Sequence, residues 1–121
     1  MTIATKALLV KSRRDDRFAI AVCAQGEKID LHGVARQVGW KKARLANSGE
    51  LAQQFGPDID IVSPFSSAEL PVVVDTPLLQ STHVLVSTGH AGNYVLMDPH
   101  EILTLTHAIA APIALPRSRW E

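Results

Sequence analysis

Alternation between apolar and polar stretches divides the chain into short elements, most of them with the length of a strand. Two apolar runs near the N-terminus, at 6–12 and 18–24, flank a charged turn and predict a β-hairpin. Three later runs also predict strands, and the turn GHAGN joins the last two. They are LPVVVD, HVLVSTG and NYVLM. Shorter strands are expected in KKARLA and in the tail APIALPRSRWE, unless the tail is simply extended.

Two segments in the first half carry the start and stop signals of helices. Asp30 can cap LHGVARQVG, whose apolar residues fall on one face, and Gly39 is a plausible end. A second helix is expected over GELAQQFG, with Asn47 or Ser48 as its cap and Gly56 as its last residue.

A third helix is expected over HEILTLTHA. It starts with a cap at Asp98, a proline at the first helical position and a capping-box glutamate at Glu101. Strands and helices are therefore interspersed without a regular βαβ rhythm. This order predicts an α+β fold with a mixed sheet rather than a doubly wound parallel one.

Length and composition restrict the class of protein. The 121 residues fit one domain, 1–121, and 46% hydrophobic residues suffice for a core. Twelve basic and twelve acidic residues cancel, so we expect no DNA or membrane partner, and any tRNA must be held by local patches. Cys23 is the only cysteine, which excludes an internal disulfide and favours a reducing, cytoplasmic location.

General catalytic motifs are absent from the sequence. There is no P-loop, no G-x-G-x-x-G and no G-x-S-x-G. The segment HEILTLTH begins like the zinc motif H-E-x-x-H, but Thr104 occupies the second histidine position, so no metal is expected. The basic clusters at 13–17 and 41–44 are interpreted as solvated turns, with contact to phosphates as the alternative.

Lys6 lies at the edge of the first apolar run. It is either a lysine whose stem covers apolar surface while its charge reaches water, or an ammonium directed into a pocket, where it would hold a carbonyl or phosphate oxygen. Composition does not choose between these two interpretations.

An ordered series of segments runs along nearly the whole chain. It consists of KALLV, FAIAV, GEKIDLHGVARQVGWKKARLANSGELAQQFG, VSPF, LPVVVD, VLVSTGHAG and DPHEILTLTHAIAAPIA. Each segment is weakly specific alone. In this order they resemble the YbaK/prolyl-tRNA synthetase-associated domain, a family of aminoacyl-tRNA deacylases that edit mischarged tRNA in trans. The resemblance implies a mixed, strongly curved sheet flanked by helices.

The resemblance also implies a reaction. These domains hydrolyse the ester joining an amino acid to the terminal ribose of tRNA, with water or a substrate group attacking and without a metal or other cofactor. The family lysine matches Lys6, which would anchor the terminal nucleotide, and the serine of V-S-x-G matches Ser87 in the pocket. The expected catalytic residues are Lys6, Asp60 and Ser87, and the expected substrate-binding residues are Ile61, Ser63, Pro64, Gly89 and His90.

The loop DIDIVSPFSS departs from the family pattern G-G-x-S-P-x-G. Asp60 and Ile61 replace the two glycines, and Ser66 replaces the third. Asp60 would pair with Lys6 or recognise an α-amino group. The alternative function is a catalytically altered module that binds a nucleotide, a tRNA end or a protein without hydrolysis.

Two further expectations concern the ends of elements. Family members carry a longer N-terminal segment before the lysine strand. Its absence would uncover a sheet face and edge, so we predict a homodimer. Asp75, at the end of LPVVVD, is expected to cap the turn that follows it rather than to act in catalysis.

Overall fold

The computed structural model describes residues 1–115. Its elements are β1 (Thr2–Ser12), β2 (Phe18–Ala24), β3 (Lys28–Ile29), α1 (Leu31–Val38), β4 (Ala43–Leu45), α2 (Ser48–Phe55), β5 (Val72–Asp75), the 3₁₀ helix η1 (Thr76–Gln80), β6 (His83–Ser87), β7 (Tyr94–Met97), α3 (Pro99–Thr106), β8 (Ile109–Ala111) and β9 (Ala114–Leu115). The α+β prediction is confirmed, and every expected helix is present. The tail was predicted to form a strand or an extended end, and its residues 116–121 lie outside the described part of the chain.

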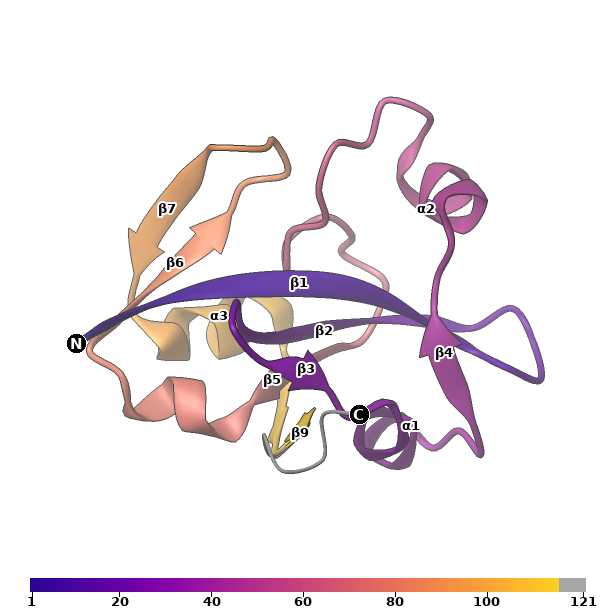
Figure 1. Ribbon diagram of the computed structural model, residues 1–121, viewed down its shortest axis with the longest axis horizontal. Helices are drawn as coiled ribbons and strands as arrows, with labels where there is room; N and C mark the ends of the chain where they lie inside the picture. The colour runs from indigo at the N-terminus through magenta and orange to yellow at the C-terminus, as the bar shows by residue number, and fades with distance from the viewer. Residues whose placement is uncertain (116–121) are drawn as a thin grey trace.

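The main sheet is mixed, as the sequence predicts. Its strand order is β7-β6-β1-β2-β5-β8, and β4 pairs with the far end of β1. β1 is parallel to β6 and antiparallel to β2, whereas β5 is parallel to both of its neighbours. Figure 1 shows β1 as one long curved strand that crosses the molecule and connects the β6–β7 hairpin with β4.

Both faces of the central strands are buried, so the molecule has two cores. In β2, Phe18, Ile20 and Val22 face one core, and the small residues Ala19, Ala21 and Cys23 face the other. The first core is closed by η1 and α3, and the second by α1 and Trp40.

The helix caps form as the sequence predicts. The Asp30 carboxylate accepts a hydrogen bond from Gly33 N–H (3.1 Å), and Gly39 ends α1 in the left-handed region at φ 79°. Asn47, not Ser48, caps α2. The cap of α3 and its glutamate also form the predicted capping box.

Asp75 corrects one prediction. η1 follows it directly, but the Asp75 side chain makes no capping hydrogen bond. Its Oδ1 instead accepts a bond from Ile113 N–H at 2.9 Å, and only 4% of the residue is exposed. Burial raises the pKa of this carboxyl, against the opposing effect of the backbone N–H groups of Ile113 and Ala114. Asp75 thus fastens the segment between β8 and β9 to the sheet.

Among residues 1–115, no helix is long and apolar enough to cross a membrane.

Candidate functional site

The carboxyl end of β6 leads into a tight turn. Ser87, the last residue of β6, is buried, and its Oγ accepts a hydrogen bond from Gly89 N–H (3.1 Å). The turn is closed by Thr88 N–H to Asn93 O and by Asn93 N–H to His90 O. Gly89 has φ 103°, a conformation that side chains rarely adopt, which explains why glycine stands there.

The loop before Ser63 docks on this turn. Asp60 Oδ2 accepts a hydrogen bond from Ala91 N–H at 2.8 Å, and Ile61 N–H donates a longer one to Gly89 O at 3.4 Å. Residues 60–61 and 89–91 therefore form one rim, although side chains stand at 60 and 61 where the family pattern has glycines. The Asp60 carboxylate is used to hold the turn.

The segment Ser63–Ser66, which we call the serine turn, is held in shape by hydrogen bonds within it. Ser63 N–H donates to Ser66 Oγ (2.8 Å), Ser66 N–H donates to Ser63 O (3.0 Å), and Phe65 N–H donates to Ser63 Oγ (3.1 Å). Ser63 and Pro64 are buried, whereas Phe65 is exposed. The Ser66 hydroxyl thus closes the turn at the position where the family pattern has glycine.

A pocket of about 320 Å³ lies between this turn, the β6–β7 hairpin and α3. Hydroxyl groups on one side of it belong to the serine turn and the end of β6, and apolar side chains form the rest. The lining residues are Ser63, Phe65, Ser66, Val86, Ser87, Thr88, Val95, Met97 and Leu105. The structure therefore brings the expected residues Ser63 and Ser87 together.

Lys6 lies on β1 and is not among the residues that line this pocket. The parallel ladder between β1 and β6 ends at Ala4 and Leu85, and Thr5 Oγ1 donates to Leu85 O (2.8 Å) just beyond it. Two positions further along each strand are Lys6 and Ser87. Because side chains alternate along strands, both project from the sheet face that Ala4 and Leu85 share, which is opposite to the first-core face of the pocket residue Val86.

Lys6 is half-buried and lies opposite Cys23 on β2. Within residues 1–115 its ammonium has neither a hydrogen-bond acceptor nor an ion-pair partner, so the expected pairing with Asp60 does not form. A lysine that is half-buried without a carboxylate leaves one positive charge of β1 uncompensated.

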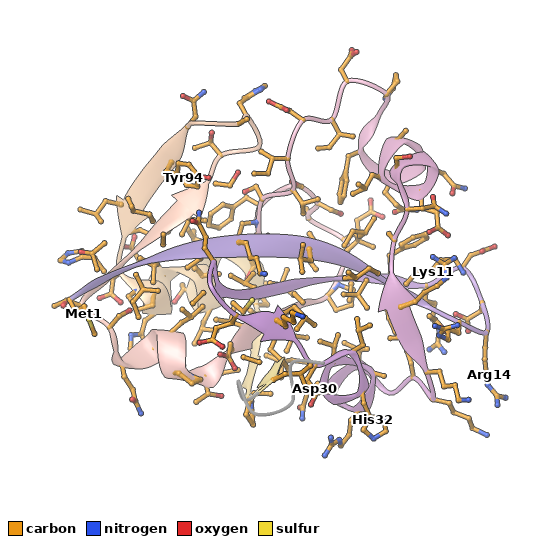
Figure 2. All side chains as sticks on the ribbon, in the orientation of Figure 1. Met1, Lys11, Arg14, Asp30, His32 and Tyr94 are labelled. Atoms are coloured by element: carbon orange, nitrogen blue, oxygen red, sulfur yellow. The ribbon has the colours of Figure 1, made fainter. Side chains whose placement is uncertain are left out.

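Two polar residues on the Lys6 side were not expected from the sequence. Tyr94 pairs with Ser87 across the hairpin, and Figure 2 shows it beside β6 and β7. Gln25 Nε2 donates to Thr5 O (3.2 Å) and, at 3.5 Å, to the Tyr94 hydroxyl. The hairpin register around GHAGN could have placed Tyr94 opposite Ser87, whereas Gln25 carries no sequence signal.

The other expected residues differ in their surroundings. His90 is exposed in the turn, and its carbonyl oxygen, not its ring, makes a hydrogen bond there. Among residues 1–115, no group of three or more histidine, cysteine or acidic side chains could hold a metal ion.

The sequence was compared with models of known protein families, and one of them matches. The model of the aminoacyl-tRNA editing domain matches residues 2–105, which include the serine turn, the β6–β7 turn and Lys6. The chain belongs to the aminoacyl-tRNA editing domain family. This membership agrees with the resemblance seen in the sequence and with the mixed fold.

Solved structures share the fold of this editing domain. A candidate trans-editing enzyme for prolyl-tRNA synthetase aligns with a TM-score of 0.79 and 23% identity over 93% of this chain and 71% of its own. The hypothetical protein APE2540 aligns with a TM-score of 0.79 and 22% identity over 93% of this chain and 74% of its own. A candidate signal transduction protein from Marinobacter aquaeolei VT8 aligns with a TM-score of 0.71 and 16% identity, over 96% of this chain but 26% of its own.

Proposed function

We propose that this editing domain is a trans-editing deacylase that hydrolyses the ester linking a wrong amino acid to the terminal ribose of tRNA. The observation that carries the proposal is the meeting of Ser63 and Ser87 among the lining residues of one pocket. Family membership supplies the reaction class.

The pocket suits the amino-acid side chain of the substrate. Its walls of Val95, Met97 and Leu105 are apolar, and they favour an uncharged side chain over a charged one. With a volume of about 320 Å³, it is at the lower end of the range for small-molecule sites, which agrees with an amino acid rather than a larger group.

Ser87 can act on the ester carbonyl. Its Oγ accepts the N–H of Gly89, and within residues 1–115 its own proton has no acceptor. A hydroxyl group carries one proton to donate, so Ser87 can give a hydrogen bond to the oxygen on which negative charge develops. Water is the nucleophile in this scheme.

Lys6 supplies the positive charge on the other side of the ester. Its compact ammonium can hold a phosphate of the terminal nucleotide or stabilise the developing oxyanion. Because no carboxylate neutralises it within residues 1–115, the charge is available to an anionic substrate.

The test is hydrolysis of a panel of mischarged tRNAs, including alanyl- and cysteinyl-tRNA(Pro), under single-turnover conditions. Removing Lys6 or the Ser87 hydroxyl is expected to lower the rate by about 10²–10³-fold, the usual loss for one group that stabilises an oxyanion. Lys6→Ala and Ser87→Ala are compared with Lys28→Ala and Ser81→Ala, which change residues outside the site. A wild-type chain that hydrolyses none of these esters contradicts the proposal.

One observation favours the second candidate, a module that binds without hydrolysis. In the loop, Ile61 N–H is bonded to Gly89 O, and the Asp60 carboxylate adds a negative charge at this rim, which would repel a phosphate. If the native chain binds tRNA without turnover and the double variant Asp60→Gly/Ile61→Gly gains turnover, the second candidate is correct.

A further inference from the structure

The fold joins two basic clusters that are far apart in the sequence. The end of β1 pairs with β4 through Ser12 and Ala43, and Arg13 N–H donates to Lys42 O at 3.0 Å. The charged turn after β1 and the segment between α1 and β4 therefore lie side by side. Cations from both segments converge on one surface.

This surface contains a hollow of about 160 Å³, which we call the basic hollow. Its lining residues are Arg13, His32, Lys41, Lys42 and Ala43. None of them is acidic, and apart from Ala43 all are exposed. Arg14 follows Arg13 in the same turn. In Figure 2, Arg14 and His32 lie on the side of the molecule away from Tyr94.

The nearest acidic side chains along the chain have other partners. Asp15 pairs with Arg17 at 3.0 Å, and Asp16 approaches Lys11 at 3.7 Å. Within residues 1–115, Arg13, Arg14, Lys41 and Lys42 take part in no ion pair. A chain of zero net charge thus carries one surface of uncompensated positive charge.

We propose that the basic hollow binds the phosphates of the tRNA acceptor stem whose 3′ end occupies the pocket at the end of β6. This inference rests on the proposed function, because it assigns the tRNA a second point of contact. Arginine and lysine side chains are the groups that neutralise RNA phosphates. The lining contains no large apolar side chain of the kind that inserts into a membrane surface.

The separation between the two sites fits one RNA. Lys6 and Ser12 belong to the same strand, and six residues at about 3.3 Å each place the hollow roughly 20 Å from Lys6 along β1. A single-stranded 3′ end followed by a duplex can extend over such a distance. β1 would then act as a fixed spacer between the ester site and the stem contacts.

The experiment compares two RNA lengths. Binding of an uncharged acceptor-stem minihelix is measured by fluorescence anisotropy at several salt concentrations, and hydrolysis is measured on the charged minihelix and on an aminoacylated trinucleotide CCA. Lys41→Gln/Lys42→Gln is expected to weaken minihelix binding about tenfold and to reduce the salt slope by about one to two. Hydrolysis of the trinucleotide is expected to stay unchanged.

Matched controls distinguish the effect of a lysine's position from the effect of the total charge of the protein. Lys28→Gln removes one charge from β3, and it is compared with each single variant at 41 and 42. Equal weakening by all three lysine changes would mean general attraction and would overturn the proposal. Tight binding to phosphatidylserine vesicles without minihelix binding would also overturn it.

The outcomes distinguish this inference from the proposed function. Hydrolysis of the charged minihelix that Lys41→Gln/Lys42→Gln leaves intact refutes the basic hollow and retains the deacylase. Minihelix binding that depends on Lys41 and Lys42, without hydrolysis of any ester, retains the basic hollow and refutes the deacylase. Lys6→Ala is expected to lower the hydrolysis of both substrates by about 10²–10³-fold, whereas Lys41→Gln/Lys42→Gln lowers the hydrolysis of the charged minihelix alone.

Discussion

At the residue scale, the loop that departs from the family pattern is held by side chains instead of being freed by glycines. Ser66 closes the serine turn through its hydroxyl, and Asp60 fastens the loop to the β6–β7 turn. Both replacements exchange backbone freedom for hydrogen bonds. A loop held in this way has fewer conformations than a glycine loop, so the replacements restrict the backbone at this rim.

Asp75 is expected to contribute strongly to stability. Its buried carboxylate accepts the Ile113 N–H, so Asp75→Ala leaves that donor without a partner, at a cost of about 1–3 kcal/mol. Asp75→Asn keeps an acceptor oxygen and should lose less. Urea unfolding followed by circular dichroism measures both variants. If alanine and asparagine destabilise equally, the hydrogen bond is not the source of the effect.

Cys23 is expected to be unreactive in the folded chain. It is fully buried in the second core, and desolvation raises the pKa of its thiol to about 11 despite the nearby charge of Lys6. Iodoacetamide at pH 8 should therefore modify Cys23 only in denaturant, as mass spectrometry can record. Rapid modification of the native protein would show that the strand opens around this residue.

Residue roles were predictable where the partner is close in sequence and unpredictable where it is distant. The caps at Asp30, Asn47 and Asp98 act within three residues and were expected. The partner of Asp75 lies 38 residues away, and nothing local indicates it. Gln25 was not predicted for the same reason, because its bonds to Thr5 and Tyr94 depend on the register of β1 and β2.

At the element scale, the ends of the helices agree with the capping and turn residues in the sequence. The helices stand between clear caps and glycine or left-handed ends, and the longer strands are continuous apolar runs. The strands β3 and β8 were not expected, because two or three residues carry no periodicity. They exist because partners from other parts of the chain, β9 and β5, pair with them.

The capping box of α2 is expected to make stability depend on acid. Glu50 accepts hydrogen bonds from Arg44 at 2.7 Å and from Asn47 N–H at 3.0 Å, and these lower the pKa of its carboxyl to about 2. Because the folded pKa is below the unfolded value of 4.5, this stabilisation is present above pH 4.5 and is lost as pH falls towards 2.

Glu50→Gln tests this dependence. The variant keeps the length of the side chain but lacks the charge, so its stability should vary less than that of the wild type between pH 5 and pH 2. Urea midpoints at several pH values give the comparison. Parallel curves for the two proteins would assign the acid sensitivity to other carboxyls.

At the scale of the whole molecule, the order of the strands in the sheet could not be predicted from the sequence. The mixed character of the sheet could be inferred from the interspersed elements, but the placement of β6 beside β1 joins residues about eighty positions apart. That placement brings the end of β6, which carries Ser87, alongside β1, which carries Lys6. The family pattern singled out Ser63 and Ser87, and only the tertiary structure shows that both line one pocket.

The open edges of the sheet support the prediction of a homodimer. β7 is an edge strand, and three of its four residues are exposed, including Leu96 at 55%. An exposed apolar edge strand readily pairs with another copy of itself. We therefore expect a dimer that pairs β7 with β7, and light scattering at tens of micromolar should give twice the mass of one chain.

Leu96→Lys places a charge on this edge and should convert the dimer to a monomer without loss of folding, since the side chain is exposed. Ile109→Lys is the matched control, because Ile109 is an exposed apolar residue on β8, the opposite edge of the same sheet. A dimer that survives Leu96→Lys but dissociates with Ile109→Lys would move the interface to β8. A wild-type mass of one chain would contradict the dimer itself and leave the apolar edge of β7 exposed to solvent.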